Sequence, residues 1–516
     1  MRRTLAVVAC LVAVLGLVPA AAFAQAPAPK VTIVGLFDQV TTAGRNIYDG
    51  NFARSSESEW YARTRFRPDF TFEVGRTKAV LGLEIDLSYG QMGANDGGFP
   101  GNVSGTNSGC KPGSNGCLDQ NTDVGGMIEI KWVYTEFDLT GKDSLLPFIP
   151  VPTVARVGGQ PYATLANYKI AYANGDFAGV SAITTFAPNL RTNLAFVQIE
   201  DQIATSNTGL IPRTVRRGDD FAVIFSPEIT PFKGLDIKPL YSFVYIQDST
   251  STATRRAIAN AQGAYGVTGN ETRHTIGLDA RWRSGPFSLD PTFYYQFGSR
   301  SNRDATGFNV HGHTSAFLAD VQGGFQLGPL LLEARGIWSS GNEAKDDLRK
   351  RQNYYEPLNL DTGYYSGWAQ ILALGVDYFN GGGGTLQSMS TNVGYDRYGR
   401  RQLGFRATYS LTPQLAFYGI VSPTWTDEKV DTDTNIVRAT AGATNRTAPA
   451  AGASGDSRYI GTEADLGVTW RFAPNTVFDL VGGYLFAGSA LDVTDASGKR
   501  DSQDGWSVTA RVRLSF

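Results

Sequence analysis

The last eleven residues, Trp506 to Phe516, divide by position into an apolar and a polar set. The apolar set is Trp506, Val508, Ala510, Val512, Leu514 and Phe516, and polar residues occupy the positions between them. Because successive side chains of a strand point to opposite faces, this segment predicts a strand with one apolar and one charged face. A strand of a soluble sandwich can alternate in the same way, but it rarely ends the chain on an aromatic residue. A strand of about ten residues with aromatics near both ends of its apolar face suits a tilted bilayer crossing.

The N-terminus has the three parts of a secretory signal peptide: Arg2 and Arg3, an apolar run over residues 5–18, and the sequence Ala22-Phe23-Ala24. That run is too short for a transmembrane anchor, and no other segment reaches the roughly 18 to 20 apolar residues of a spanning helix. A membrane protein with this sequence must therefore be a barrel. We expect a signal peptide over 1–24, a short periplasmic leader over 25–30, and one outer-membrane β-barrel over 31–516.

Charge and composition agree with this class. Without Arg2 and Arg3 the basic count falls from 46 to 44 against 48 acidic residues, a balance that indicates no nucleic acid partner. The chain contains 59 Gly, 23 Tyr and 29 Phe but only 4 Met and 3 Cys, which favours many strands and turns in an exported protein.

The same alternation recurs along the chain, beginning with Val31–Gln39 and Trp60–Phe72. Counting gives about twenty strands, of which Val154–Gly158 and Thr385–Gly394 have the weakest patterns. A barrel of this kind needs an even number, so 16 to 20 are allowed. The parity slips within Val133–Phe137, which predicts a β-bulge there.

Connections between the predicted strands alternate in length. Short ones with turn residues are Gly75-Arg76-Thr77, Ala187-Pro188-Asn189, Gly328-Pro329, Thr412-Pro413 and Ala473-Pro474-Asn475. Long polar ones cover roughly 90–125, 201–218, 248–271, 341–365, 427–457 and 489–504. Short periplasmic turns and long outer loops are typical of outer-membrane barrels. We therefore expect both ends of the barrel chain in the periplasm.

A late hairpin carries a family resemblance. Residues 461–491 (GTEADLGVTWRFAPNTVFDLVGGYLFAGSAL), together with RFRPDF at 65–70, resemble the alginate-export family of outer-membrane channels, and the first strand resembles that of general bacterial porins. The family's barrels have eighteen strands. The resemblance therefore implies an all-β, up-and-down, antiparallel transmembrane barrel of about 18 strands that forms a large single-chain channel.

Charged side chains at alternate positions predict the lumen face. Arg63, Arg65 and Arg67 lie on one face of one strand, and near the bilayer midplane each would cost about 2 to 4 kcal/mol on the lipid side. By the same parity the lumen also receives Glu84, Asp86, Arg273, Asp279, Arg281, Arg406, Glu463, Asp465, Arg471, Arg511 and Arg513. Two interpretations stay open: a cationic ladder that selects anions, and a salt-bridged wall that fills the lumen.

Cys110 and Cys117 lie in a long polar loop, and outside the cytoplasm two such neighbours predict a disulfide. His311 and His313 alone do not make a metal site, so the sequence predicts no metal and no cofactor. Motifs of hydrolases, metalloproteases and nucleotide-binding proteins are missing from the sequence.

A passive channel for small hydrophilic solutes, with anions favoured by clustered arginines, is the leading function. A barrel enzyme or a structural or adhesive barrel acting through its outer loops is the alternative. Expected partners are outer-membrane lipid, small solutes, and the barrel assembly machinery through the strand ending at Phe516. The sequence predicts no oligomeric state.

Overall fold

The computed structural model of the chain is a closed antiparallel β-barrel. It describes residues 28–47, 52–53, 58–89, 128–162, 172–173, 176–201, 219–246, 268–303, 309–348, 350–358, 368–372, 393–433, 453–495 and 497–516. Nineteen strands share one sheet, and without the two-residue strand β14 (Arg351–Gln352) the barrel has eighteen, the number that the family resemblance implies and within the range of 16 to 20 that counting allows. In these parts of the chain, no helix is long and apolar enough to cross a membrane.

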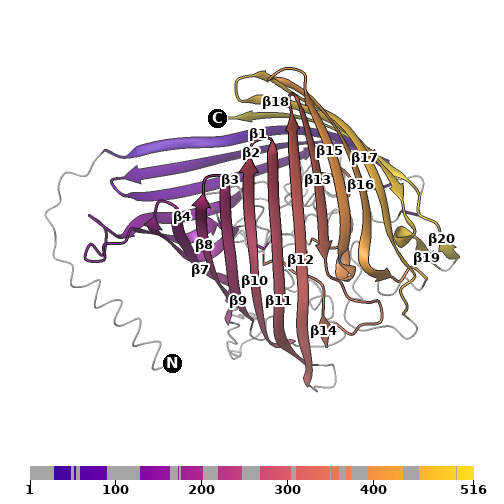
Figure 1. Ribbon diagram of the computed structural model, residues 1–516, viewed down its shortest axis with the longest axis horizontal. Coiled ribbons are helices and arrows are strands. Elements are labelled where there is room, and N and C mark those ends of the chain that lie inside the picture. The colour runs from indigo at the N-terminus through magenta and orange to yellow at the C-terminus, as the bar shows by residue number, and fades with distance from the viewer. Residues whose placement is uncertain are drawn as a thin grey trace, which may run out of the picture.

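The barrel strands follow one another in chain order, and Figure 1 shows β1–β3 crossing β9–β13, as tilted strands of facing walls do. The first nine are β1 (Lys30–Arg45), β2 (Ser58–Val74), β3 (Thr77–Tyr89), β4 (Ile128–Thr140), β5 (Thr153–Pro161), β6 (Asp176–Ala187), β7 (Leu190–Asp201), β8 (Asp219–Phe232) and β9 (Leu235–Ile246). The others are β10 (Thr268–Ser284), β11 (Phe287–Arg303), β12 (Asn309–Leu327), β13 (Leu330–Ser339), β15 (Arg400–Ser410), β16 (Leu415–Val430), β17 (Ser457–Ala473), β18 (Thr476–Ala487) and β21 (Gly505–Ser515).

The first and last strands close the barrel. β21 pairs with β18 on one side and with β1 on the other. Phe516 completes this seam, because its amide donates to the Gly35 carbonyl at 3.0 Å and its carbonyl accepts from the Gly35 amide at 2.8 Å. Gly35 lets the strands approach, since a β-carbon there would lie 2.2 Å from the Arg67 carbonyl oxygen.

Side chains divide between the faces as the alternation predicts. On β21, Trp506, Val508 and Leu514 point outward and stay 38 to 44% exposed, whereas Ser507 and Thr509 are buried inside the barrel. The outer face is therefore apolar and the lumen face polar, the reverse of a soluble protein.

Short and long connections alternate as expected, with two exceptions: β4 and β5 are joined by twelve residues at the short-turn end, and β11 and β12 by five residues at the other end. The turns at 75–76, 188–189, 328–329, 411–414 and 474–475 lie at one end of the barrel, together with the start of β1 and the C-terminus (Figure 1). The long connections lie at the other end, which we call the outer end. One of them holds the short strands β19 (Val493–Asp495) and β20 (Gly498–Arg500) after the 3₁₀ turn η4 (Ser489–Leu491).

Three details differ from the sequence prediction. The bulge lies at Lys131, just before Val133–Phe137, because Trp132 pairs with Gly82 and Ile130 pairs with Leu83. β10 already begins at Thr268, inside the predicted loop 248–271. The third difference concerns the proposed strand over Thr385–Gly394.

That strand prediction is wrong at its described end. Val393 and Gly394 lie in a bend before the 3₁₀ turn η3 (Asp396–Tyr398), and the rest of the segment lies outside the described residues. The whole stretch 340–399 instead connects β13 to β15. Val393 is apolar and fully buried, so it resembles a strand residue in the sequence without belonging to the barrel.

Candidate functional site

The arginine row on β2 forms the densest charge cluster of the lumen wall. Arg63 and Arg65 are buried, and Arg65 Nη2 lies 2.7 Å from Glu84 Oε1 on β3. The other oxygen of Glu84 lies 3.1 Å from Arg67 Nε and 3.6 Å from Lys131 Nζ. One carboxylate therefore contacts three cations.

Acidic residues on the neighbouring strands complete this cluster. Lys131 Nζ also lies 3.4 Å from Asp176 Oδ2, and the Trp132 indole donates to Asp176 Oδ1 at 2.6 Å. Asp69 on β2 faces the same site across Gly82. On the other side of β2, Asp38 of β1 lies directly opposite Arg65 in the strand register. Asp86 is paired with Arg65 in the β2–β3 register, but its side chain is outside the described set.

Elsewhere on the wall, predicted lumen arginines pair with single acids. Arg511 is directly opposite Asp479, and Arg513 is directly opposite Asp38, with N–O distances of 2.7 and 2.5 Å. Arg281 lies 2.7 Å from Asp236, and Arg406 lies 3.8 Å from Glu333. This part of the wall matches the salt-bridged interpretation.

Arg471 differs from these residues. It has the parity of the lumen face, but it lies at the short-turn end of β17 and is exposed. It therefore belongs to the rim and not to the interior wall.

The connection between β13 and β15 enters the lumen. The Glu356 carboxylate lies 2.6 Å from Arg273 Nη1. The Glu356 main-chain amide donates to Gln296 Oε1 at 3.0 Å, and Gln296 Nε2 donates to the Glu356 carbonyl at 2.7 Å. β14 adds a short parallel pairing to β12. The segment 350–358 is thus fastened across the inner face of β10, β11 and β12.

A second connection, between β5 and β6, meets the first one inside the barrel. The Tyr172 hydroxyl donates to Ser242 Oγ at 2.8 Å, and the Leu358 amide donates to the Tyr172 carbonyl at 2.8 Å. The Tyr172 ring lies 6.1 Å from Tyr294, whose hydroxyl donates to Asp279. Burial raises the pKa of Tyr172, so this hydroxyl stays a neutral donor.

Glu463 on β17 holds a third inward segment, 368–372. Its carboxylate accepts the main-chain amides of Gln370, Ile371 and Leu372 at 2.7, 2.6 and 2.7 Å. Three successive amides around one anion form a concave backbone site. The Gln370 side chain donates onward to Thr509 Oγ1 on β21 at 2.9 Å.

Glycine and a second acid complete this contact. Asp465 lies beside Glu463 on the same face of β17 and is 2% exposed. A β-carbon at Gly483 would lie 2.5 Å from Asp465 Oδ1 and 3.3 Å from Gln370 Cβ. Only glycine therefore leaves room for the segment at this point of β18. The three inward segments all lie against the lumen face of the wall.

Several of these residues were missing from the sequence-based site. Lys131 is displaced by the bulge, and Glu356 and Gln370 lie in a connection, where alternation gives no direction. The sequence does contain one sign of the inward segments: apolar residues such as Val197 and Ile224 occupy the lumen face of β7 and β8. Both are fully buried, because the inserted segments cover them.

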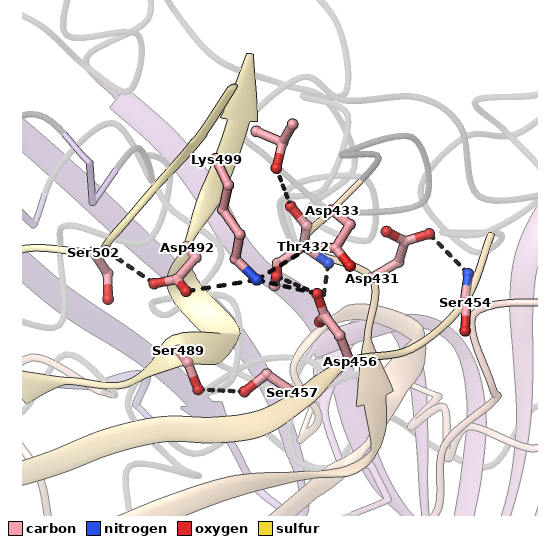
Figure 2. Close-up of polar contacts among 11 residues, drawn as sticks. Asp431, Thr432, Asp433, Ser454, Asp456, Ser457, Ser489, Asp492, Lys499 and Ser502 are labelled. Carbon is pink, nitrogen blue, oxygen red and sulfur yellow. Dashed lines mark hydrogen bonds and ion pairs between the residues drawn. The ribbon is translucent and has the colours of Figure 1, made fainter. Parts of the chain in front are cut away.

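At the outer end, charged residues tie the β16–β17 connection to the β18–β21 connection (Figure 2). Lys499 Nζ lies 3.2 Å from Asp433, 3.3 Å from Asp456 and 3.9 Å from Asp492. Burial alone would raise the pKa of Asp456, but hydrogen bonds from Thr432 and the charge of Lys499 outweigh it, so this pKa is lowered. Burial likewise opposes the charge of Lys499, but the bond to Asp433 and the charge of Asp456 raise its pKa.

Cys110 and Cys117 lie outside the described residues, so their disulfide stays a prediction. Among the described side chains, no three His, Cys, Asp or Glu residues are placed to share a metal ion.

No protein-family model and no curated protein matches the chain. Solved structures that align with it include Pseudomonas aeruginosa OpdQ, at 10% identity over 94% of this chain and 97% of that chain, with a TM-score of 0.45. Pseudomonas aeruginosa OccK8 (OprE) aligns at 13% identity over 94% and 98%, with a TM-score of 0.45. Acinetobacter baumannii OccAB4 aligns at 9% identity over 94% and 98%, with a TM-score of 0.45. Likeness at this level does not identify a function, which must follow from the barrel itself.

Proposed function

We propose that the protein is a channel of the bacterial outer membrane that lets small hydrophilic solutes diffuse through its lumen. The observation that carries this proposal is the closed eighteen-stranded barrel, whose outer face is apolar and whose inner face is charged. A closed sheet satisfies its backbone hydrogen bonds in lipid, and barrels with this many strands are wide enough for an aqueous path.

The inward segments give the channel a filter instead of a wide pore. Segments 350–358 and 368–372 bring side chains and backbone amides against the charged wall. A solute then passes groups at close range, where charge and hydrogen bonding discriminate.

Small anions are the favoured solutes, because Arg63, Arg65 and Arg67 lie at alternate positions on the lumen face of β2, which places three guanidinium groups close together along the passage. Closely spaced like charges in a confined passage leave a positive potential. The opposing effect comes from Glu84, which contacts two of these arginines.

Planar-bilayer recording tests both parts of the proposal. The purified protein should produce discrete conductance steps, and its reversal potential across a salt gradient should indicate anion preference. The triple variant with Arg63, Arg65 and Arg67 changed to Ser should lose that preference. An unchanged reversal potential would assign these arginines to bracing the wall, whereas a lack of conductance steps would contradict the channel itself.

Export and assembly complete the proposal. Residues 1–24 act as a signal peptide, residues 25–30 form a periplasmic leader, and β21 ending at Phe516 is the segment that the assembly machinery recognises. The resemblance of residues 461–491, which form the β17–β18 hairpin, supports a relation to alginate-export channels. It does not identify a polyuronate as the solute.

A further inference from the structure

The connection between β4 and β5 is unusual among the described turns at the short-turn end. It covers residues 141–152, twelve residues, where the β2–β3 and β6–β7 turns have two each. It also carries an apolar tip: Leu145, Phe148 and Ile149 are 45, 78 and 37% exposed, and the value for Phe148 is the highest among the described large apolar side chains.

The tip is held in place by the turn's own hydrogen bonds. The Leu146 amide donates to the Leu139 carbonyl at 2.9 Å, and the Gly141 amide donates to the Ile149 carbonyl at 2.9 Å. The Ser144 hydroxyl adds a bond to the Gly141 carbonyl at 2.7 Å. The apolar residues are therefore presented by an ordered scaffold, and their exposure is a property of the fold.

Two basic residues, Arg76 and Lys142, lie at the base of this turn. Arg76, on the neighbouring β2–β3 turn, donates to the Lys142 carbonyl and lies 3.1 Å from Asp138. The side chains of Arg76 and Lys142 are exposed, with Asp143 as the exposed acid between them and the tip. Exposed cations next to an apolar tip suit the anionic headgroups of a phospholipid leaflet.

We propose that the tip formed by Leu145, Phe148 and Ile149 is a lipid anchor that inserts into the periplasmic leaflet of the outer membrane. On the outward faces of the two strands that the turn joins, Val133 and Val157 are each 45% exposed. A contiguous exposed apolar patch marks a site of contact with a membrane or with another protein. The inference rests on the proposed membrane location of the barrel.

Fluorescence quenching of site-specific labels tests the anchor. Cys10, Cys110 and Cys117 are replaced by serine, and a bimane label is placed on a new cysteine in three variants: Phe148→Cys, Asp143→Cys and Val180→Cys. Position 143 is the polar control on the same turn, and position 180 is the control on the outward face of β6. The labelled proteins are reconstituted in phosphatidylglycerol-containing vesicles with brominated phosphatidylcholine, or treated with iodide in vesicles without it.

Bromolipid should quench most emission from positions 148 and 180, and iodide should quench position 143. Iodide quenching at 148 with lipid quenching at 180 overturns the anchor and leaves the channel proposal intact. Protection of 148 from both quenchers overturns it too, since a protein surface then covers the tip. Iodide quenching at 180 overturns the membrane barrel and the anchor together.

Discussion

At the scale of single residues, Glu84 governs the balance of charge in the lumen. It is the one described carboxylate that contacts Arg65, Arg67 and Lys131 together, whereas Arg511 has its own acid, Asp479, directly opposite. In the arginine cluster one carboxylate therefore balances several cations, whereas along the rest of the wall an arginine such as Arg511 has an acid of its own.

Changing Glu84 to Gln should strengthen anion selectivity. A unit charge about 4 Å from another contributes about 4 kcal/mol at an effective dielectric constant near 20, so removing it leaves a markedly more positive passage. The measurement is the reversal potential across a salt gradient. Asp479→Asn is the matched control, because it removes one wall carboxylate outside the cluster, and it should cause a smaller shift. Equal shifts in the two variants would argue against a special role for the cluster.

The outer loop cluster should lose its order in acid. Since the folded pKa of Asp456 is lowered, its ionised carboxylate stabilises the loop cluster above the ordinary aspartate pKa of about 3.9. This stabilisation is lost as the pH falls through the folded value. Since the folded pKa of Lys499 is raised, its charge stabilises the loop cluster fully below the ordinary lysine pKa of about 10.4. This stabilisation is lost only as the pH rises through the folded value, so it does not change in acid. A nitroxide at Ser454 should gain mobility in acid, and Asp456→Asn should show that mobility at neutral pH. A line shape independent of pH would contradict this linkage.

Alternation in the sequence predicts which face a residue occupies but not its partner. Arg65 pairs with Asp86 in strand register, but its guanidinium contacts Glu84, one position along the same face. Lys131 reaches the cluster only because a bulge displaces it. Long side chains and local irregularities decide such contacts after the fold has formed.

At the scale of elements, the inward segment 368–372 depends on one strand residue. Glu463 satisfies three main-chain amides that have no sheet partner, and burial of an unsatisfied amide costs about 1 to 3 kcal/mol. Polar contacts with β17 and β21 thus hold the segment against the wall. Gly483 leaves the room that this close approach needs.

Changing Glu463 to Ala should release this segment and raise the single-channel conductance. Each of the three buried amides then needs a new partner, which the segment finds by leaving the wall for water. Single-channel recording of the variant against the parent measures the effect. Asp479→Ala controls for removal of a lumen carboxylate that holds no inward segment, and it should leave conductance nearly unchanged. A conductance equal to the parent's would show that the segment does not obstruct the path.

Strands and turns were predictable, but the inward segments were not. A strand such as Trp506–Phe516 is recognisable because apolar and polar residues alternate over its whole length. A turn such as Pro474-Asn475 is recognisable because it contains residues that favour turns. Connections have no such periodicity, so apolar residues in the stretch 340–399 resembled a strand near Thr385–Gly394. The burial of Val393, at the described end of that segment, depends on contacts in the folded barrel, which the local sequence does not contain.

At the scale of the whole molecule, closure connects the two ends of the chain. β1 and β21 form the seam, and Asn46 bonds the main chain of Phe52 at 3.2 Å and of Gln503 at 2.7 Å at the outer end of the seam. Because eighteen is even, the first and last strands begin and end the barrel on the same side. That side carries the short turns.

The alternation of short and long connections predicts how the barrel is oriented in the membrane. The short-turn end, with both chain termini, should face the periplasm, and the end with the long connections should face outside. Ser454 lies in the β16–β17 connection, and Asn475 lies in the two-residue β17–β18 turn, so single cysteines at these positions report on the two ends of β17. A membrane-impermeant maleimide applied to intact cells should label position 454 and leave position 475 unlabelled, and after the outer membrane is permeabilised it should label both. Labelling of 475 alone in intact cells would show the opposite topology, because the single strand β17 joins the two positions and places them at its two ends.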